Sequence, residues 1–314
     1  MRPARRHTAI IAGIVALLLI VTGGFYVSRN PENKTLDDAA RAHAPGHFVR
    51  LADGVTHYDV AGPDSARTVV LVHGFSVPAY IWDSTATALA AAGYRVVRYD
   101  EYGRGWSDRP DVKYDADLYD RQLVQLLDSL HVRDRIDLGG VSMGGWVTAT
   151  FVNRHPERVR SLMLSDPVAG TSGAASGKFY WPLVGGFLWQ ALSVPNMAQG
   201  QVSDLADPSR FPDWADRYRP QMQFRGFGRA LLSTRRETAG MNTDTLYERV
   251  GKTGVPVLLL WGTQDKTVPF ARNAGVRAAI PGAEFHAIDG AAHLPILERA
   301  ALTDSIILAF LAHK

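Results

Sequence analysis

The feature that most restricts the fold of this chain is a repeated alternation of short apolar runs with longer helical patterns. Short runs rich in apolar residues occupy residues 68–72, 95–99, 136–138, 159–164, 257–260 and 285–288, and the run at 68–72 (TVVLV) is continuous. Helical patterns lie between or after them at residues 81–92, 118–130, 144–155, 270–279 and 296–312. A strand covered on both faces is apolar throughout. The alternation therefore predicts an α/β fold, in which a mostly parallel sheet is flanked by helices on both faces.

The alternation has a different beginning and one interruption. Residues 48–51 and 56–60 form a predicted hairpin that turns at Asp53-Gly54. From about residue 168 to 250 the pattern stops, and this stretch holds 11 aromatic residues in 83. We interpret it as an inserted cap within a single α/β domain of residues 46–314. Its aromatic side chains either line an apolar pocket or form the insertion's own core.

The N-terminus carries a separate signal for a membrane. Residues 8–27 contain no charged side chain, and Arg2, Arg5 and Arg6 precede them. At ~1.5 Å per residue, such a helix is long enough to cross a ~30 Å hydrocarbon core. The basic cluster predicts a cytoplasmic N-terminus and an extracytoplasmic domain, with residues 1–45 as transmembrane anchor and linker. The alternative is a secreted protein whose signal peptide has been cleaved.

Composition excludes several classes of protein. The 314 residues include no cysteine, which removes disulfides, Cys-ligated zinc, iron–sulfur clusters and a thiol nucleophile. Of the 34 basic residues, four lie in residues 1–29, where there is no acid, so 30 basic residues face 31 acidic ones in the remainder. The net charge of +3 therefore belongs to the leader. We expect no nucleic-acid surface.

A serine flanked by glycines carries the chemistry. Gly140-Val141-Ser142-Met143-Gly144 follows a predicted strand and opens a predicted helix. This sharp turn exposes the serine hydroxyl, and the helix N-terminus adds partial positive charge beside it. Ser142 is therefore the expected nucleophile. An idle serine in a glycine-rich turn is the plainer alternative.

A serine nucleophile needs a base, and the base needs an orienting acid. Beyond Ser142 the chain has four histidines, of which only His293 lies in a loop directly after a predicted strand. Asp265 occupies the corresponding position after the strand at 257–260. We expect His293 as base and Asp265 as acid, with Asp166 as the rival acid and Asp289 as a turn residue.

Two backbone N–H groups are needed to bind the oxyanion. One is expected from Met143, the residue after the nucleophile. The other is expected from the loop His73-Gly74-Phe75-Ser76, most directly from Phe75. Each such donor stabilises the transition state by about 3 kcal/mol. His73 is interpreted as a structural residue of this loop.

Taken together, these motifs resemble the α/β-hydrolase superfamily over about residues 46–314. The segments that carry the resemblance are His73-Gly74-Phe75, Asp100–Ser107, Gly140–Gly145, Asp265 in Gly-Thr-Gln-Asp, and His293 in Ala-Ala-His-Leu-Pro. The resemblance implies a serine hydrolase similar to carboxylesterases and monoacylglycerol lipases, and a structural role for Asp100–Ser107. Dehalogenases and epoxide hydrolases of this fold use an aspartate at the sharp turn between strand and helix, the nucleophile elbow. Ser142 stands at this elbow and argues against both classes. Val141 departs from the Asn that precedes the serine in carbon–carbon bond hydrolases, and Met143 departs from the Trp of proline iminopeptidases.

The sequence therefore predicts a membrane-anchored hydrolase of lipophilic carboxylic esters that works through an acyl-enzyme, without cofactor or metal. Two alternatives stay open. One is carbon–carbon bond hydrolysis of a diketone, and the other is a tethered protein that binds a ligand without catalysis. The acyl and alcohol portions of the substrate and the oligomeric state are not determined by sequence.

Overall fold

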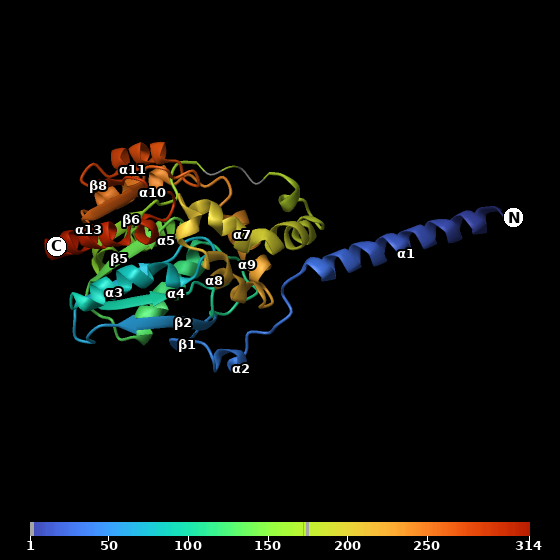
Figure 1. The fold of residues 1–314 in the computed structure, drawn as a ribbon, viewed down its shortest axis with the longest axis horizontal. Coiled ribbons are helices and arrows are strands. Elements are labelled where there is room, and N and C mark those ends of the chain that lie inside the picture. The colour runs from blue at the N-terminus through green and yellow to red at the C-terminus, as the bar shows by residue number, and fades with distance from the viewer. Residues whose placement is uncertain (1–2, 172, 174–175) are drawn as a thin grey trace.

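A single eight-stranded sheet organises the chain (Figure 1). The computed structural model describes residues 3–171, 173 and 176–314. The strands lie in the order β1-β2-β4-β3-β5-β6-β7-β8. Their bounds are β1 His47–Leu51, β2 Gly54–Ala61, β3 Thr68–Val72, β4 Arg95–Tyr99, β5 Ile136–Val141, β6 Val159–Ser165, β7 Val257–Gly262 and β8 Glu284–Ile288. The last six strands in this order, from β4 through β3 to β8, run parallel to one another. The strand β2 pairs antiparallel with both β1 and β4. The predicted mostly parallel sheet and the N-terminal hairpin are confirmed.

Helices cover both faces of this sheet. The face bearing Val70 and Val72 packs against α4 Ala116–Ser129, α5 Met143–Arg154, α10 Asp244–Lys252 and α11 Asn273–Ala279. The face bearing Val69 and Leu71 packs against α3 Asp83–Ala91 and α13 Ala300–Ala312. Successive strand side chains point to opposite faces, so two covered faces require apolar residues at every position. That requirement explains the apolar sequences of β3 and β7, which are buried at every position.

The last helix differs from its prediction as one continuous element. It is divided into α12 Pro295–Glu298 and α13, with Arg299 between them at φ −128° and ψ 40°. The Glu298 carboxylate accepts hydrogen bonds from the N–H groups of Ala292, at 2.9 Å, and Ala206, at 2.7 Å. These contacts fix the end of α12 against two loops, and sequence periodicity contains no sign of them.

Between β6 and β7 the chain forms many short helices. They are η3 Lys178–Tyr180, α6 Gly185–Leu188, η4 Trp189–Ser193, η5 Val194–Asn196, α7 Met197–Gly200, η6 Gln201–Asp204, η7 Pro208–Arg210, α8 Trp214–Met222 and α9 Phe227–Glu237. Trp189, Trp214, Tyr218 and Phe227 are buried against one another and against the body. These aromatic residues therefore form a core for the segment. The domain division and the bounds of an inserted cap remain predictions, and α10, inside the predicted range, packs against α5 and α11.

The N-terminal helix α1 Pro3–Arg29 projects from one end of the body (Figure 1). Among the described residues it is the single helix long and apolar enough to cross a membrane, and its span Ile10–Arg29 is not buried in the protein. The following linker is fixed rather than loose. Glu32 accepts hydrogen bonds from the N–H groups of Gly226, at 2.6 Å, and Gly228, at 2.7 Å, at the start of α9. The short helix α2 Asp38–Arg41 then leads into β1.

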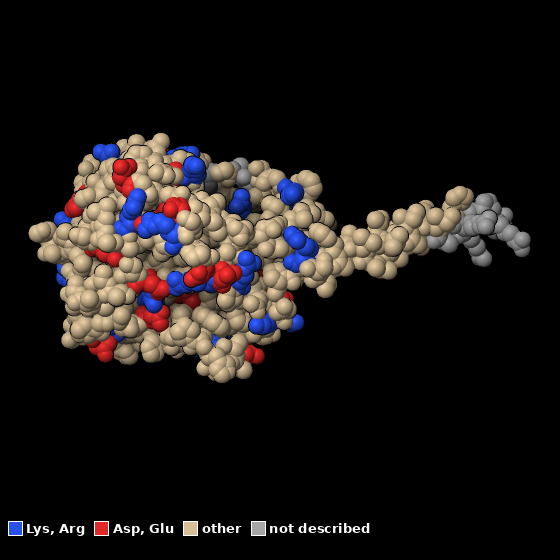
Figure 2. All heavy atoms as spheres, in the orientation of Figure 1, with Lys and Arg blue, Asp and Glu red and all other residues tan. Residues whose placement is uncertain are grey.

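The remaining short helices are η1 Ala79–Trp82, η2 Pro156–Arg158 and η8 Phe270–Arg272. Charged side chains of both signs are spread over the visible face of the body. The part of α1 that is not drawn in grey is almost entirely tan and so bears almost no charge (Figure 2). This contrast agrees with a polar body and an apolar extension.

Candidate active site

Ser142 occupies a strained turn between β5 and α5. Its backbone has φ 54° and ψ −117°, a conformation that residues with a side chain rarely adopt. The flanking glycines are required by packing. A Cβ on Gly140 would lie 2.3 Å from the Gly144 carbonyl oxygen, and one on Gly144 would lie 2.4 Å from that of His73. The turn thus depends on both glycines of the motif.

His293 and Asp265 meet in loops that follow β8 and β7. The His293 Nδ1 atom lies 2.8 Å from the Asp265 Oδ2 atom, and both residues are buried. The other carboxylate oxygen accepts hydrogen bonds from the N–H groups of Thr267, at 2.8 Å, and Val268, at 2.9 Å. Because the carboxylate can only accept, Nδ1 carries the hydrogen and Nε2 is left for another partner.

Several charges act on His293. Burial alone would lower the pKa of the imidazole, but the hydrogen bond and charge of Asp265, helped by Asp204 and Glu298, raise the pKa above its ordinary value. The surroundings therefore favour the imidazolium that a general base becomes when it accepts a proton.

Two cavities meet at Ser142. The larger, about 190 Å³, is lined mainly by apolar side chains; its lining residues are Phe75, Ser142, Met143, Trp146, Val168, Arg235, Thr238 and Met241. The smaller, about 130 Å³, contains both Ser142 and His293 together with polar side chains of the β6–β7 segment, Gln201 and Asp204. The structure thus brings Ser142, His293 and Asp265 to one edge of the sheet.

The loop after β3 lies beside the same serine, because a Cβ on Gly74 would lie 3.2 Å from the Ser142 Cβ and Phe75 lines both cavities. Phe75 as an oxyanion donor stays a prediction. His73 is buried, with its Nδ1 2.7 Å from the Gly74 carbonyl oxygen. Its Nε2 accepts a hydrogen bond from the N–H of Glu101 at 2.9 Å. Burial lowers the pKa of His73 to about 4, so the ring is neutral and both nitrogens are used within the protein. His73 therefore fits the predicted structural role.

Arg104 connects this loop to two other parts of the site. Its guanidinium is completely buried and donates to the Phe75 carbonyl oxygen at 2.8 Å and to the Thr234 hydroxyl of α9 at 3.0 Å. One of its nitrogens also lies 4.0 Å from the sulfur of Met143. Both residues that we expect to bind the oxyanion therefore contact one side chain. From sequence, Asp100–Ser107 was expected to be structural, and these contacts of Arg104 were not predicted.

Asp166, the rival acid, lies next to Asp265 but is not the partner of His293. Its Oδ1 accepts a hydrogen bond from the N–H of Gly262 at 2.8 Å. Burial first, and then the neighbouring Asp265 carboxylate, raise the pKa of Asp166 well above its ordinary value. Asp166, Asp265 and His293 also form a cluster whose potential ligand atoms lie within 4.8 Å of one another. An Asp166 oxygen bonded to the Gly262 N–H and a His293 nitrogen bonded to Asp265 suit a hydrogen-bonded network better than a cation site.

Asp204 is the site residue that the sequence analysis missed. It comes from η6 in the β6–β7 segment. Its backbone carbonyl oxygen accepts a hydrogen bond from the backbone N–H of His293 at 3.0 Å. Its carboxylate accepts the Thr267 hydroxyl at 2.5 Å and lines the smaller cavity. No motif surrounds Asp204 in the sequence, so only the packing of the segment reveals it.

Comparison with known proteins agrees with this geometry. The family model described as "Alpha/beta hydrolase family" matches residues 69–304. The 2-hydroxy-6-oxononadienedioate/2-hydroxy-6-oxononatrienedioate hydrolase of Paraburkholderia xenovorans (strain LB400) is 30% identical over 283 residues, which cover 85% of this chain and 95% of the relative.

Two solved structures extend the comparison. A thermophilic esterase from Thermogutta terrifontis has a TM-score of 0.73 at 22% identity and covers 85% of this chain and 99% of its own. A membrane phospholipase A, described as a bacterial virulence factor, has a TM-score of 0.68 at 22% identity and covers 100% of this chain and 99% of its own. At these identities the structural likeness shows the fold alone. The family match and the sequence relative together show that this chain belongs to the alpha/beta hydrolase family.

Proposed function

We propose that this chain is a serine hydrolase in which Ser142 attacks a carbonyl carbon. The observation that carries the proposal is the 2.8 Å contact of Asp265 with His293, which lines the same small cavity as Ser142. As the serine oxygen bonds to carbon, its proton passes to His293, and Asp265 stabilises the charged imidazole. His293 then protonates the leaving group. A water molecule, activated by His293, releases the acid from Ser142.

The negative oxygen of the intermediate is bound by the N–H groups of Phe75 and Met143. Met143 is the first residue of α5, and the first N–H groups of a helix have no partner within it. The contact of Arg104 with the Phe75 carbonyl supports the position of the second donor. Two fixed donors lower the barrier without reorganisation during the reaction.

The sequence relatives favour a carbon–carbon bond over the ester that we expected from sequence. The compound in the name of the Paraburkholderia relative has a hydroxyl, a ketone and two carboxylates but no ester or amide, so its hydrolysis breaks a carbon–carbon bond. For this chain we therefore propose, as first candidate, cleavage beside a ketone. The leaving carbon takes the proton from His293 and forms a C–H bond, while the acyl part leaves as an acid.

Ester hydrolysis is the second candidate, and the lining of the site favours it. The larger cavity is mostly apolar, and Arg235 is its single basic residue. The smaller cavity contains the Asp204 carboxylate, which repels a second carboxylate. The similar folds of the esterase and of the membrane phospholipase A, both named for cleaving esters, add support for an ester. Non-catalytic ligand binding is the remaining alternative.

We further propose that α1 is an uncleaved membrane anchor and that residues 46–314 form an extracytoplasmic hydrolase domain with a cap at about residues 168–250. The support is the exposed apolar span Ile10–Arg29 and the basic residues that precede it. Cleavage within residues 21–24 and secretion of the remainder is the alternative. The mature N-terminal sequence distinguishes the two.

One experiment tests the reaction and the bond together. The full chain and its Ser142→Ala variant are given p-nitrophenyl esters of increasing acyl length and, separately, a 2-hydroxy-6-oxo-dienoate. Turnover of the dienoate to an acid and a new C–H product supports the first candidate, and turnover of esters alone supports the second. A fluorophosphonate probe should label the parent and not Ser142→Ala. If neither substrate reacts and the probe does not label, the hydrolase proposal fails.

A further inference from the structure

Exposed apolar side chains are concentrated in one turn of the body. Outside α1, the described residues include five large apolar side chains that are exposed: Val112, Trp181, Leu183, Val184 and Leu302. Three of the five fall within the four residues Trp181-Pro182-Leu183-Val184, which we call the apolar turn. Single exposed apolar residues are common on soluble proteins, but adjacent ones mark a surface that something covers.

The backbone of the apolar turn holds Leu183 outward. The Val184 N–H donates to the Pro182 carbonyl oxygen at 2.7 Å, which closes a three-residue turn around Leu183. Leu183 has φ 66°, in the left-handed region that residues with a side chain rarely adopt, and its relative exposure is 102%. A strained backbone that places a leucine wholly in water is unfavourable for an isolated soluble body. It becomes favourable where the leucine enters an apolar medium.

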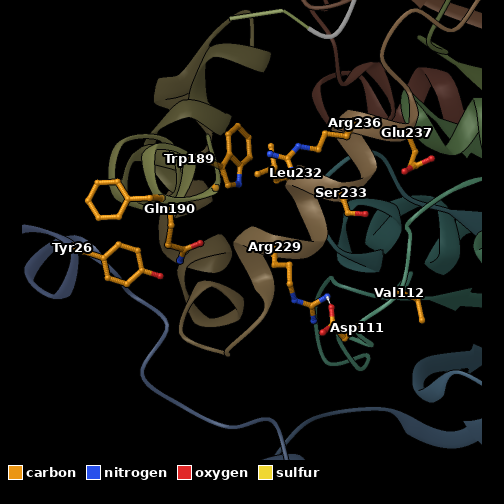
Figure 3. Close-up of a pocket in the computed structure, with 12 residues that line it drawn as sticks. Tyr26, Asp111, Val112, Trp189, Gln190, Arg229, Leu232, Ser233, Arg236 and Glu237 are labelled. Carbon is orange, nitrogen blue, oxygen red and sulfur yellow. Dashed lines mark hydrogen bonds and ion pairs between the residues drawn. The ribbon is translucent and has the colours of Figure 1, made fainter. Parts of the chain in front are cut away.

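The apolar turn lies beside the base of α1. It leads into α6, where Phe187 stacks on Tyr26 of α1 with ring centroids 5.4 Å apart. In η4, the Gln190 amide donates to the Asn30 side chain at 2.7 Å. Figure 3 shows Tyr26 facing Gln190 across this junction, beside a hollow of about 590 Å³. The end of the apolar helix and the apolar turn therefore belong to one face.

Basic side chains surround the same face. Arg29 ends α1, Lys178 precedes the turn, and Arg235 and Arg236 lie on α9; all four are exposed. Arg236 donates to the Phe179 carbonyl oxygen at 3.1 Å, which places it next to the turn. Glu237 is the acidic neighbour on α9, and Asp111 is paired with Arg229 at 2.9 Å (Figure 3). Figure 2 shows blue side chains on the end of the body from which α1 leaves.

We propose that the apolar turn inserts into the surface of the phospholipid bilayer that α1 spans, with Lys178, Arg235 and Arg236 against anionic lipid phosphates. The inference rests on the proposed anchor but not on which bond the enzyme cleaves. A span of 20 residues brings the base of α1 to the boundary between hydrocarbon and headgroups. Trp at this depth and basic residues at the phosphates match the usual chemistry of that boundary.

Arg235 links this surface to the catalytic cavity. It is exposed on α9 and also lines the larger cavity at Ser142. A docked body would therefore present that cavity close to the bilayer. A lipophilic substrate could then reach Ser142 from the membrane without crossing bulk water.

The absence of cysteine makes a direct test possible. In the full chain, Leu183→Cys is labelled with a polarity-sensitive fluorophore and reconstituted in vesicles of phosphatidylcholine with phosphatidylglycerol. Leu302→Cys is the matched control, because Leu302 is also exposed but belongs to α13, at the opposite end of the body from α1. Leu18→Cys reports whether α1 is inserted.

We expect a blue-shifted emission, and quenching by lipids that carry a nitroxide, at positions 183 and 18 but not at 302. The shift at 183 should grow with the phosphatidylglycerol content and fall with added salt. Quenching at 18 without quenching at 183 overturns the docking and leaves the anchor intact. No quenching at 18 overturns the anchor itself. A shift at 183 that follows protein concentration rather than lipid composition assigns the turn to a second copy and also overturns the proposal.

Discussion

Among the described residues, two His–Asp pairs that are buried on both sides have nearly the same geometry and different surroundings. His293 Nδ1 lies 2.8 Å from Asp265 Oδ2, and His57 Nδ1 lies 2.7 Å from Asp100 Oδ2. All four side chains are buried. The second pair has its remaining nitrogen occupied, because His57 Nε2 lies 2.9 Å from the Pro45 carbonyl oxygen. His293, by contrast, lines a cavity together with Ser142.

The different surroundings of the two pairs show that a histidine–carboxylate contact does not by itself make a histidine a general base. His57 has an acceptor at each nitrogen, which requires both to carry hydrogen and stabilises the charged ring. Burial opposes that charge, but Asp100 outweighs it, so the pKa of His57 is raised. Because both nitrogens of His57 are bonded within the protein, this ring joins the linker to the sheet and has no nitrogen left for a substrate. A ring with one nitrogen toward a serine can accept its proton.

The largest expected effect comes from Asp265→Asn. An amide at this position donates to Nδ1, which moves the ring hydrogen to Nε2, so His293 can no longer accept the serine proton. We expect kcat to fall by about 10⁴-fold with little change in melting temperature. Asp166→Asn is the matched control, and because Asp166 bonds to the Gly262 N–H and Asp265 is the acid bonded to His293, it should change kcat far less. Equal losses in both variants would place Asp166 in the working pair.

Asp100→Asn should break the second pair with the opposite result. Asp100 is buried and accepts hydrogen bonds from the N–H groups of Ala79, at 2.8 Å, and Trp106, at 2.9 Å, besides its contact with His57. Removing one partner of a buried pair costs about 3–5 kcal/mol of unfolding free energy. Denaturant unfolding should show this loss, while kcat per folded molecule changes much less than in Asp265→Asn. A loss of kcat with unchanged stability would contradict the structural role of this pair.

Asp204→Asn sharpens the comparison at the catalytic pair. The Asp204 carboxylate helps to raise the pKa of His293, and only the neutral ring acts as a base. Without that charge the pKa falls, so the acid limb of the kcat/KM profile should move to lower pH while the plateau stays nearly constant. An unmoved limb would mean that Asp204 is screened from His293.

The smallest effect is the pH dependence of stability due to His57. The pKa of His57 is raised and that of Asp100 is lowered, the latter by His57 against the effect of burial. The first contribution is complete below the unfolded pKa of His, about 6.5, and is lost as pH rises through the folded value. The second is complete above the unfolded pKa of Asp, about 3.9, and is lost on acidification. The difference in melting temperature between parent and His57→Gln should therefore be largest between these limits, and a constant difference from pH 4 to 9 would refute the linkage.

Much of the fold was predictable because its causes are local or periodic. Strands covered on both faces are rich in apolar residues, and the alternation of such runs with helical patterns marked β3, β4, β6 and β7 within a residue or two. The serine turn was predictable because Gly140 and Gly144 face backbone atoms at distances that exclude a side chain. The positions of Asp265 and His293 followed from strand ends, since parallel strands bring their carboxyl ends to one edge.

Tertiary structure alone decided which of two acids, Asp265 or Asp166, contacts His293, because both follow neighbouring strands in the sequence. It also decided that Asp204 reaches the site from the β6–β7 segment, that Arg104 joins Phe75 to α9, and that His57 is occupied on both nitrogens. These contacts connect different segments of the chain, such as His57 and Asp100, which are 43 positions apart, and depend on how segments without periodic patterns pack. The sequence by itself determined the sheet, the elbow and the apolar N-terminal helix, because each follows from the properties of adjacent residues. The polar network around them depends on side chains that only folding brings within hydrogen-bonding distance.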